Sequence, residues 1–194
     1  MVGGPDDGLP GTDADVAVFE GSKGSYEFGV DAVSGSLTVT SKDTGSVDIL
    51  EGIETLSFGD GPLTVSRPSS DAAFTLTGAD GADDVIEVQS EIGFVLEGAS
   101  GADTLIGGSG DDTLIGGGGD DVFVVDGGED VIDGGAGRDA LDFSASVAGV
   151  QVDLSAGTLV DGEGFEDQFS SIEVVTGSDA ADTLVGSDGD DTLL

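Results

Sequence analysis

The sequence contains no cysteine, histidine or tryptophan, and only four basic residues among 194. Without cysteine the chain has no disulfides, and without cysteine and histidine it lacks the ligands that zinc and copper prefer. Any bound metal must therefore be held by oxygen atoms. This favours calcium over magnesium, because magnesium usually takes fewer carboxylates and keeps several waters. The motifs His-Glu-x-x-His and Gly-x-Ser-x-Gly are also missing, so we expect no enzyme.

Acidic residues dominate the charge: 41 Asp and Glu give a net charge of -37. Such a chain repels itself when compact, and it is repelled by nucleic acid and by anionic membranes. We expect no nucleic-acid partner and no membrane insertion, since no stretch approaches the roughly 18 apolar residues that span a bilayer. A secretory signal peptide is not visible in residues 1–10. The basic residues, interpreted as solvated surface charges, are Lys23, Lys42, Arg67 and Arg138.

Residues 98–142 divide without a gap into five nonapeptides: GASGADTLI, GGSGDDTLI, GGGGDDVFV, VDGGEDVID and GGAGRDALD. An earlier copy, GADGADDVI, begins at Gly78, and later copies begin at Gly177 and Gly186. A fixed short period of this kind is typical of a solenoid. In every copy position six is Asp and position eight is apolar. The position-eight residues, expected to point inward, are Val85, Leu105, Leu114, Phe123, Ile132, Leu141, Leu184 and Leu193.

The spacing of the repeats predicts how their loops stack. Three glycines allow a tight turn, Asp follows at its lip, and the next residues form a short strand. Two units then make a coil of 18 residues, which places Asp103 over Asp121, and Asp121 over Asp139. On the other side Asp112 lies over Asp130. A calcium ion between stacked loops gains two carboxylates and about four carbonyls. One large apolar side chain per repeat is too little to offset the ordering of so many glycines, so metal binding must contribute to folding.

Residues 15–66 carry no nonapeptide. Their short apolar segments, separated by Gly, Asp and Ser, favour a β-meander or small sandwich. SRPSSDA (66–72) is the best linker candidate. The expected inward positions are Val16, Val18, Leu37, Val39, Leu56 and Phe58. The expected divisions are a leader (1–14), an N-terminal β region (15–68), a roll (69–142), a β spacer (143–175) and a second repeat block (176–194).

The run GGSGDDTLIGGGGDDVFV resembles the RTX, or haemolysin-type, calcium-binding repeats of secreted bacterial proteins. DILEGIETLSFGDGPL (48–63) resembles sequences that accompany such repeats, as do segments between DALDFS (139–144) and SIEVVTGS (171–178). The resemblance implies an all-β fold, a right-handed parallel β-roll with an N-terminal antiparallel β region. It also implies type I secretion, an extracellular or cell-surface location, and folding triggered by external calcium.

The resemblance further implies a set of calcium ligands. Val125 and Asp126 replace the first two glycines of one loop, and Ala180 replaces a fourth-position glycine, so those sites are expected to be weaker or distorted. The implied metal-site residues are Asp83, Asp103, Asp112, Asp121, Asp130, Asp139, Asp182, Asp191, Gly107, Gly108, Ser109, Gly110, Gly116, Gly117, Gly118, Gly119, Gly135 and Gly137.

Two functions remain open. The leading hypothesis is a calcium-responsive folding and secretion module, with several calcium ions and a larger parent polypeptide as partners. The alternative is structural: the last repeat reaches Leu194 without a cap, so copies could stack end to end into a calcium-dependent filament, surface layer or adhesin component. Without calcium, a disordered acidic Gly-rich chain is expected.

Overall fold

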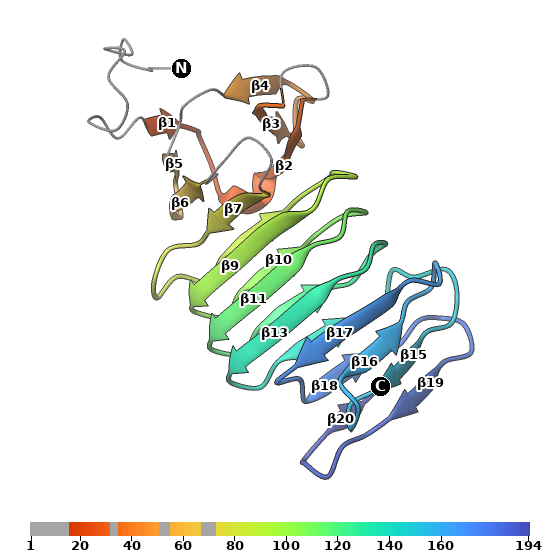
Figure 1. The fold of residues 1–194 in the computed structure, drawn as a ribbon. Helices are drawn as coiled ribbons and strands as arrows, with labels where there is room; N and C mark the ends of the chain where they lie inside the picture. The colour runs from red at the N-terminus through yellow and green to blue at the C-terminus, as the bar shows by residue number, and fades with distance from the viewer. Residues whose placement is uncertain (1–15, 32–34, 51–54, 67–72) are drawn as a thin grey trace.

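The computed structural model describes residues 16–31, 35–50, 55–66 and 73–194. These residues form three β-sheets and one short 3-10 helix, η1 (Lys23–Ser25) (Figure 1). No helix among them is long and apolar enough to cross a membrane. The fold of this part of the chain is therefore all-β, as predicted.

The three sheets are named by size and position. The long sheet contains, in spatial order, β1 (Val16–Val18), β5 (Thr55–Phe58), β6 (Gly61–Ser66), β7 (Phe74–Thr77), β9 (Phe94–Ser100), β11 (Thr113–Gly118), β13 (Val131–Ala136), β17 (Glu166–Ser170), β16 (Thr158–Val160), β15 (Gln151–Asp153) and β19 (Thr183–Val185). The short sheet contains β20 (Thr192–Leu193), β18 (Val174–Thr176), β14 (Ala140–Asp142), β12 (Val122–Val124), β10 (Thr104–Ile106) and β8 (Val85–Glu87). The N-terminal sheet contains β2 (Tyr26–Val30), β3 (Leu37–Ser41) and β4 (Val47–Leu50).

From β9 to β14 the chain forms a parallel β-roll, passing alternately between the long and the short sheet (Figure 1). Strands of one sheet pair in parallel: Leu114 lies beside Ile132 in the long sheet, and Leu105 lies beside Phe123 in the short sheet. Both pairs are 18 residues apart in sequence, which confirms the predicted coil of two nonapeptides.

Position-eight side chains fill the space between the two sheets. Those of residues 98–142 are fully buried, as predicted. The prediction for Val85 is wrong, because its side chain is 37% exposed and Ile86 takes the inward place beside Leu105. Leu193 is also exposed, because β20 is an edge strand of the short sheet. The buried position-eight residues are Leu105, Leu114, Phe123, Ile132 and Leu141.

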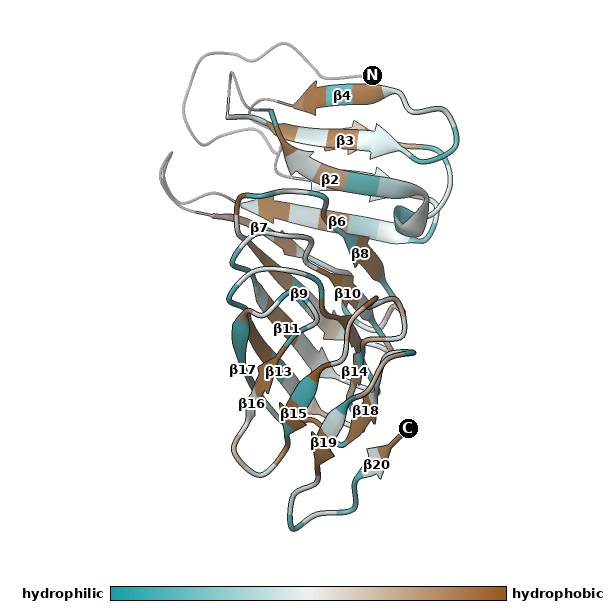
Figure 2. Ribbon diagram, turned by 90° about the vertical axis from the view of Figure 1, so that its right-hand side faces the viewer, coloured by the Kyte–Doolittle hydropathy of each residue, from teal (hydrophilic) through white to brown (hydrophobic). Residues whose placement is uncertain are grey.

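The strands before the roll, β1 to β6, are called the N-terminal strands, and they continue the roll upward (Figure 2). A parallel bridge joins Phe28 of β2 to Val88 beyond β8, and Gln89 N–H donates to Phe28 O at 2.7 Å. One hydrophobic core therefore runs through both regions. In β1 the predicted inward positions Val16 and Val18 are exposed, because Ala17 faces the core beside Leu56. The other predicted inward positions, Leu37, Val39, Leu56 and Phe58, are buried.

The spacer predicted at 143–175 builds an asymmetry into the roll. A hairpin of β15 and β16 adds two antiparallel strands to the long sheet between β17 and β19. The short sheet has no such addition, since β14 pairs directly with β18, and β18 with β20. The predicted division at residues 68 and 69 stays a prediction. The predicted leader and most of the predicted linker lie outside the described residues.

Candidate metal centre

Acidic side chains form a vertical column where the chain passes from the long to the short sheet. The Oδ1 atoms of Asp103, Asp121 and Asp139 each accept the backbone N–H of the acid one turn earlier. The N to Oδ1 distance is 2.7 Å from Asp84 to Asp103, 2.8 Å from Asp103 to Asp121 and 2.9 Å from Asp121 to Asp139. Asp139 N–H donates in turn to Glu173 Oε2 at 3.0 Å. These five residues are called the first column.

A second column lies where the chain returns from the short to the long sheet. Phe94 N–H donates to Asp112 Oδ1 at 2.6 Å, and Asp112 N–H donates to Asp130 Oδ1 at 2.9 Å. Asp130 N–H donates to Asp167 Oδ1 at 2.8 Å. Asp112, Asp130 and Asp167 form the second column. The structure thus brings the predicted Asp residues of the central run together, in the predicted pairs.

One oxygen of most column members is left without a partner. The residues themselves are buried, and their Oδ2 atoms are shielded from solvent with no hydrogen bond. A buried polar atom in this state is unfavourable unless a ligand satisfies it. The column atoms concerned are Oδ2 of Asp103, Asp112, Asp121, Asp139 and Asp167, together with Oδ1 of Asp84.

Backbone carbonyls converge on the same places. At Gly98 and at Gly116, a Cβ atom would overlap Oδ2 of the acid in the same loop, and it would lie 2.7 Å from a carbonyl oxygen of the next turn. No other residue type fits these positions without displacement. The space beside each Oδ2 is thus bordered by hard oxygen donors, which suit calcium better than a soft metal.

Burial changes the acidity of the column. It raises the pKa of Asp103 to about 6, of Asp112 to about 7 and of Asp130 to about 8, and repulsion from neighbouring acids adds to the rise. Burial also raises the pKa values of Asp121 and Asp139. Charged carboxylates at neutral pH therefore require a compensating cation in both columns.

The loop glycines allow successive turns to approach closely. Gly117 and Gly119 have φ of +103° and +126°, and a Cβ at either would overlap a carbonyl of the preceding turn. The predicted loop residues Gly107, Gly108, Ser109 and Gly110 lie between β10 and β11. Gly116, Gly117 and Gly118 end β11, Gly119 follows it, Gly135 lies in β13, and Gly137 follows β13.

The acid at position five forms a separate ladder on the exposed side. Asp111 Oδ1 accepts the N–H of Glu129, and Asp120 Oδ1 accepts that of Arg138. Asp83 belongs to this ladder, because it is exposed and accepts the N–H of Ala102 at 2.8 Å. The copy at Gly78 has one additional loop residue, so Asp84 takes the column position that the sequence assigned to Asp83.

The predicted ligands near the C-terminal end have different surroundings. Asp182 accepts hydrogen bonds from Val150 N–H and from Ser178, and these contacts lower its pKa. Asp191 accepts hydrogen bonds from the N–H and hydroxyl of Ser187. Neither residue is among the buried acids with an unpartnered oxygen.

Three column residues escaped the sequence prediction: Asp84, Asp167 and Glu173. Asp167 had a recognisable signal, since residues 162–170 (GEGFEDQFS) have Gly at position one, Asp at six and an apolar residue at eight. Glu173 follows only six residues after Asp167, so the period of nine conceals it.

A family model described as the RTX calcium-binding nonapeptide repeat, in four copies, matches residues 97–132, 115–145 and 170–194. The chain carries RTX calcium-binding repeats. RTX repeats bind several calcium ions per repeat region, and they are structural rather than catalytic. They occur in secreted bacterial proteins. No curated protein matches the chain.

The donors of the two columns fit the calcium of RTX repeats. Within the described residues, no three acidic side chains are grouped closely enough to hold one ion. Two carboxylates and several backbone carbonyls are therefore the donor set that the stacked loops can offer, which approaches the six to eight oxygens that calcium takes.

Proposed function

We propose that this chain is a calcium-responsive folding module of an exported bacterial protein, which folds outside the cell and supports type I secretion. The proposal is carried by the buried carboxylate oxygens that have no partner in the two columns. The sequence has four basic residues against 41 acidic ones, so it cannot supply the missing charge itself. Extracellular calcium modules bind their ion at about 0.1–1 mM, a concentration far above that of cytosolic free calcium.

Within this proposal, each ion lies between neighbouring loops of one column. Asp103 and Asp121 would hold one such ion, and Asp112 and Asp130 another. Carbonyl oxygens of the glycine loops, including those at the predicted positions, complete the coordination. Asp83 is replaced by Asp84 in the column, and Asp182 and Asp191 belong at most to weaker sites. When bound, calcium supplies the positive charge that allows buried carboxylates to remain ionised.

Circular dichroism of the purified chain tests the folding part of the proposal. In chelator we expect the spectrum of a largely unfolded roll, because no calcium compensates the repulsion among the carboxylates of the two columns. Titration with calcium should restore β-structure cooperatively in the millimolar range, and the same concentration of magnesium should not. Identical spectra with and without calcium would refute calcium-driven folding.

The secretion part has its own test. Cells that express the full protein with a type I exporter should release it, and the released roll should resist protease only when the medium contains calcium. An Asp121→Asn chain should be exported but remain sensitive to protease. A roll that is already folded inside the cell would contradict the proposal. Calcium-dependent end-to-end stacking remains a separate hypothesis, tested by sedimentation of the calcium-loaded chain.

A further inference from the structure

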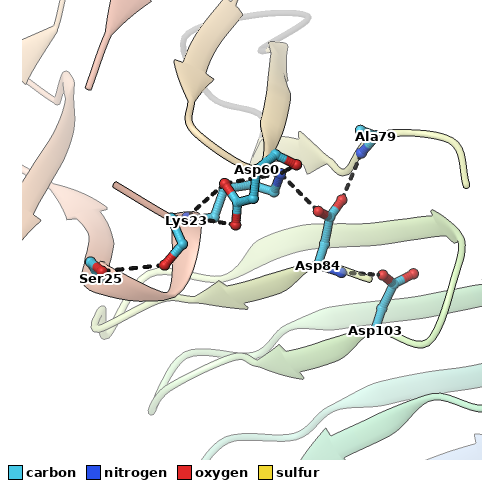
Figure 3. Close-up of polar contacts among 7 residues, drawn as sticks. Lys23, Ser25, Asp60, Ala79, Asp84 and Asp103 are labelled. Atoms are coloured by element: carbon cyan, nitrogen blue, oxygen red, sulfur yellow. Dashed lines mark hydrogen bonds and ion pairs between the residues drawn. The ribbon is translucent and has the colours of Figure 1, made fainter. Parts of the chain in front are cut away.

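The upper end of the first column differs from the turns below it. Asp84 heads the column, and within the described residues no preceding turn donates a backbone N–H to its Oδ1. Instead, Lys23 Nζ lies 2.8 Å from Asp84 Oδ1 (Figure 3). Asp84 Oδ2 accepts the N–H of Ala79 at 2.6 Å. Asp84 Oδ1 is a buried atom without a hydrogen bond, but the ion pair with Lys23 neutralises it without calcium. Among the described residues, Oδ2 of Asp103, one turn below, has neither a hydrogen bond nor an ion pair.

Lys23 is placed for this contact by the N-terminal strands. Its side chain is 0% exposed, so the interpretation of Lys23 as a solvated charge is wrong. Its backbone N–H donates to both carboxylate oxygens of Asp60 at 3.0 Å. Its Nζ donates to Asp60 O at 3.3 Å and lies 3.6 Å from Asp60 Oδ1. A buried ammonium is unfavourable unless it is paired, and here two carboxylates and a carbonyl surround it.

The helix that carries Lys23 rests on the first strand of the short sheet. A Cβ on Gly24 would lie 3.3 Å from Val85 Cβ, which shows that η1 packs directly on β8. Asp60 comes from the turn between β5 and β6, and Asp84 immediately precedes β8. The Lys23 ammonium therefore connects three segments that are far apart in the sequence.

We infer that Lys23 is a built-in cation that closes the first column, in place of both a preceding turn and a calcium ion, and that it fixes the N-terminal strands to the roll. Its ammonium brings to Asp84 the positive charge that calcium would bring to the turns below. The inference rests on the proposed calcium loading only for those lower turns, and the calcium titration of the unmodified chain tests that loading separately.

A double-mutant cycle at saturating calcium tests the inference. Lys23→Met keeps the length of the side chain but leaves the Asp84 carboxylate buried without its ammonium, and we expect Tm to fall by about 10 °C. Adding Asp84→Asn should restore much of that loss, because the neutral amide leaves no buried charge. Tm changes that simply add across the cycle would overturn the inference.

Lys42→Met is the matched control. Lys42 pairs with Glu87 of β8, the strand that Asp84 immediately precedes. The Lys42 side chain is 29% exposed, so we expect Tm to change by no more than about 3 °C. Hydrogen exchange at β2 and β8 should be faster in Lys23→Met than in Lys42→Met, and equal effects would contradict the inference. If Lys23→Met does not fold, a folded Lys23→Met/Asp84→Asn chain supports the inference, and an unfolded one overturns it.

Discussion

The N-terminal strands and the RTX roll share one hydrophobic core but differ in how they are stabilised. In the N-terminal strands, Phe19, Tyr26 and Phe58 form an aromatic cluster with ring centroids 5.3 Å apart, and Lys23 neutralises buried acid. The roll has one large inward side chain per repeat, and below Asp84 its columns of buried acids have no basic partner among the described residues. The stability of the first region is thus encoded in its own side chains, whereas that of the second depends on the ion concentration.

Removal of calcium should separate the two regions most strongly. For a site held at 100 times its Kd, calcium adds about 2.7 kcal/mol, so chelation should speed amide exchange in residues 98–142 by roughly 100-fold or more. Amides of β3 and β5 should change much less. Hydrogen exchange with mass spectrometry measures both. Equal loss of protection in the two regions would mean that the core couples them completely.

Loss of one column carboxylate should have the next largest effect. Asp121 has neighbours above and below in the first column, and Asp121→Asn is expected to raise the calcium midpoint of folding by about tenfold or more. Asp191→Asn is the matched control at position six, because Asp191 bonds only to Ser187; its midpoint should change by no more than about twofold. Calcium titrations followed by circular dichroism give both midpoints, and similar shifts for the two variants would argue against the columns as the calcium-binding sites.

Acidification should act oppositely on the roll with and without calcium. Burial raises the pKa of Asp112 to about 7 and of Asp130 to about 8, from 3.8, so the folded chain holds protons that the unfolded chain releases. The calcium-free roll therefore loses stability as pH rises from about 4 to 8, so its folded fraction in chelator, measured by circular dichroism, should be larger at pH 5 than at pH 8. With calcium the trend reverses, because protons compete for the ligands. A folded fraction in chelator that rises with pH would contradict this prediction.

The smallest effect on stability and calcium binding is expected from a substitution in the exposed ladder. Asp120 neighbours Asp121 in sequence, but it accepts only the N–H of Arg138 on the exposed side. Asp120→Asn should therefore cost about 0.5–1 kcal/mol in thermal unfolding and leave the calcium midpoint nearly unchanged. A shift as large as that of Asp121→Asn would place Asp120 among the ligands.

The sequence predicts the roll well wherever its period of nine is unbroken, because period and apolar position together determine the register of each coil. Leu114 and Ile132 pair as the spacing requires. Prediction fails where one residue is added, as at Asp84, or where a turn is shortened, as at Glu173. Lys23 could not be predicted either, because its burial depends on Asp60 and Asp84, whose proximity arises only from the tertiary fold.

The β15–β16 hairpin acts as a dislocation in an otherwise regular lattice of turns. Two extra strands enter the long sheet and none enter the short sheet at this level. Translation by one coil therefore no longer relates the repeats on either side of the hairpin. Both columns reach only the near side of this fault, the first with Asp139 bonded to Glu173 and the second with Asp130 bonded to Asp167. Beyond the fault, Asp182 before β19 accepts the N–H of Val150, and Asp191 before β20 accepts the N–H of Ser187. Cooperative ion binding along the two columns should therefore end at the fault on both sides of the molecule.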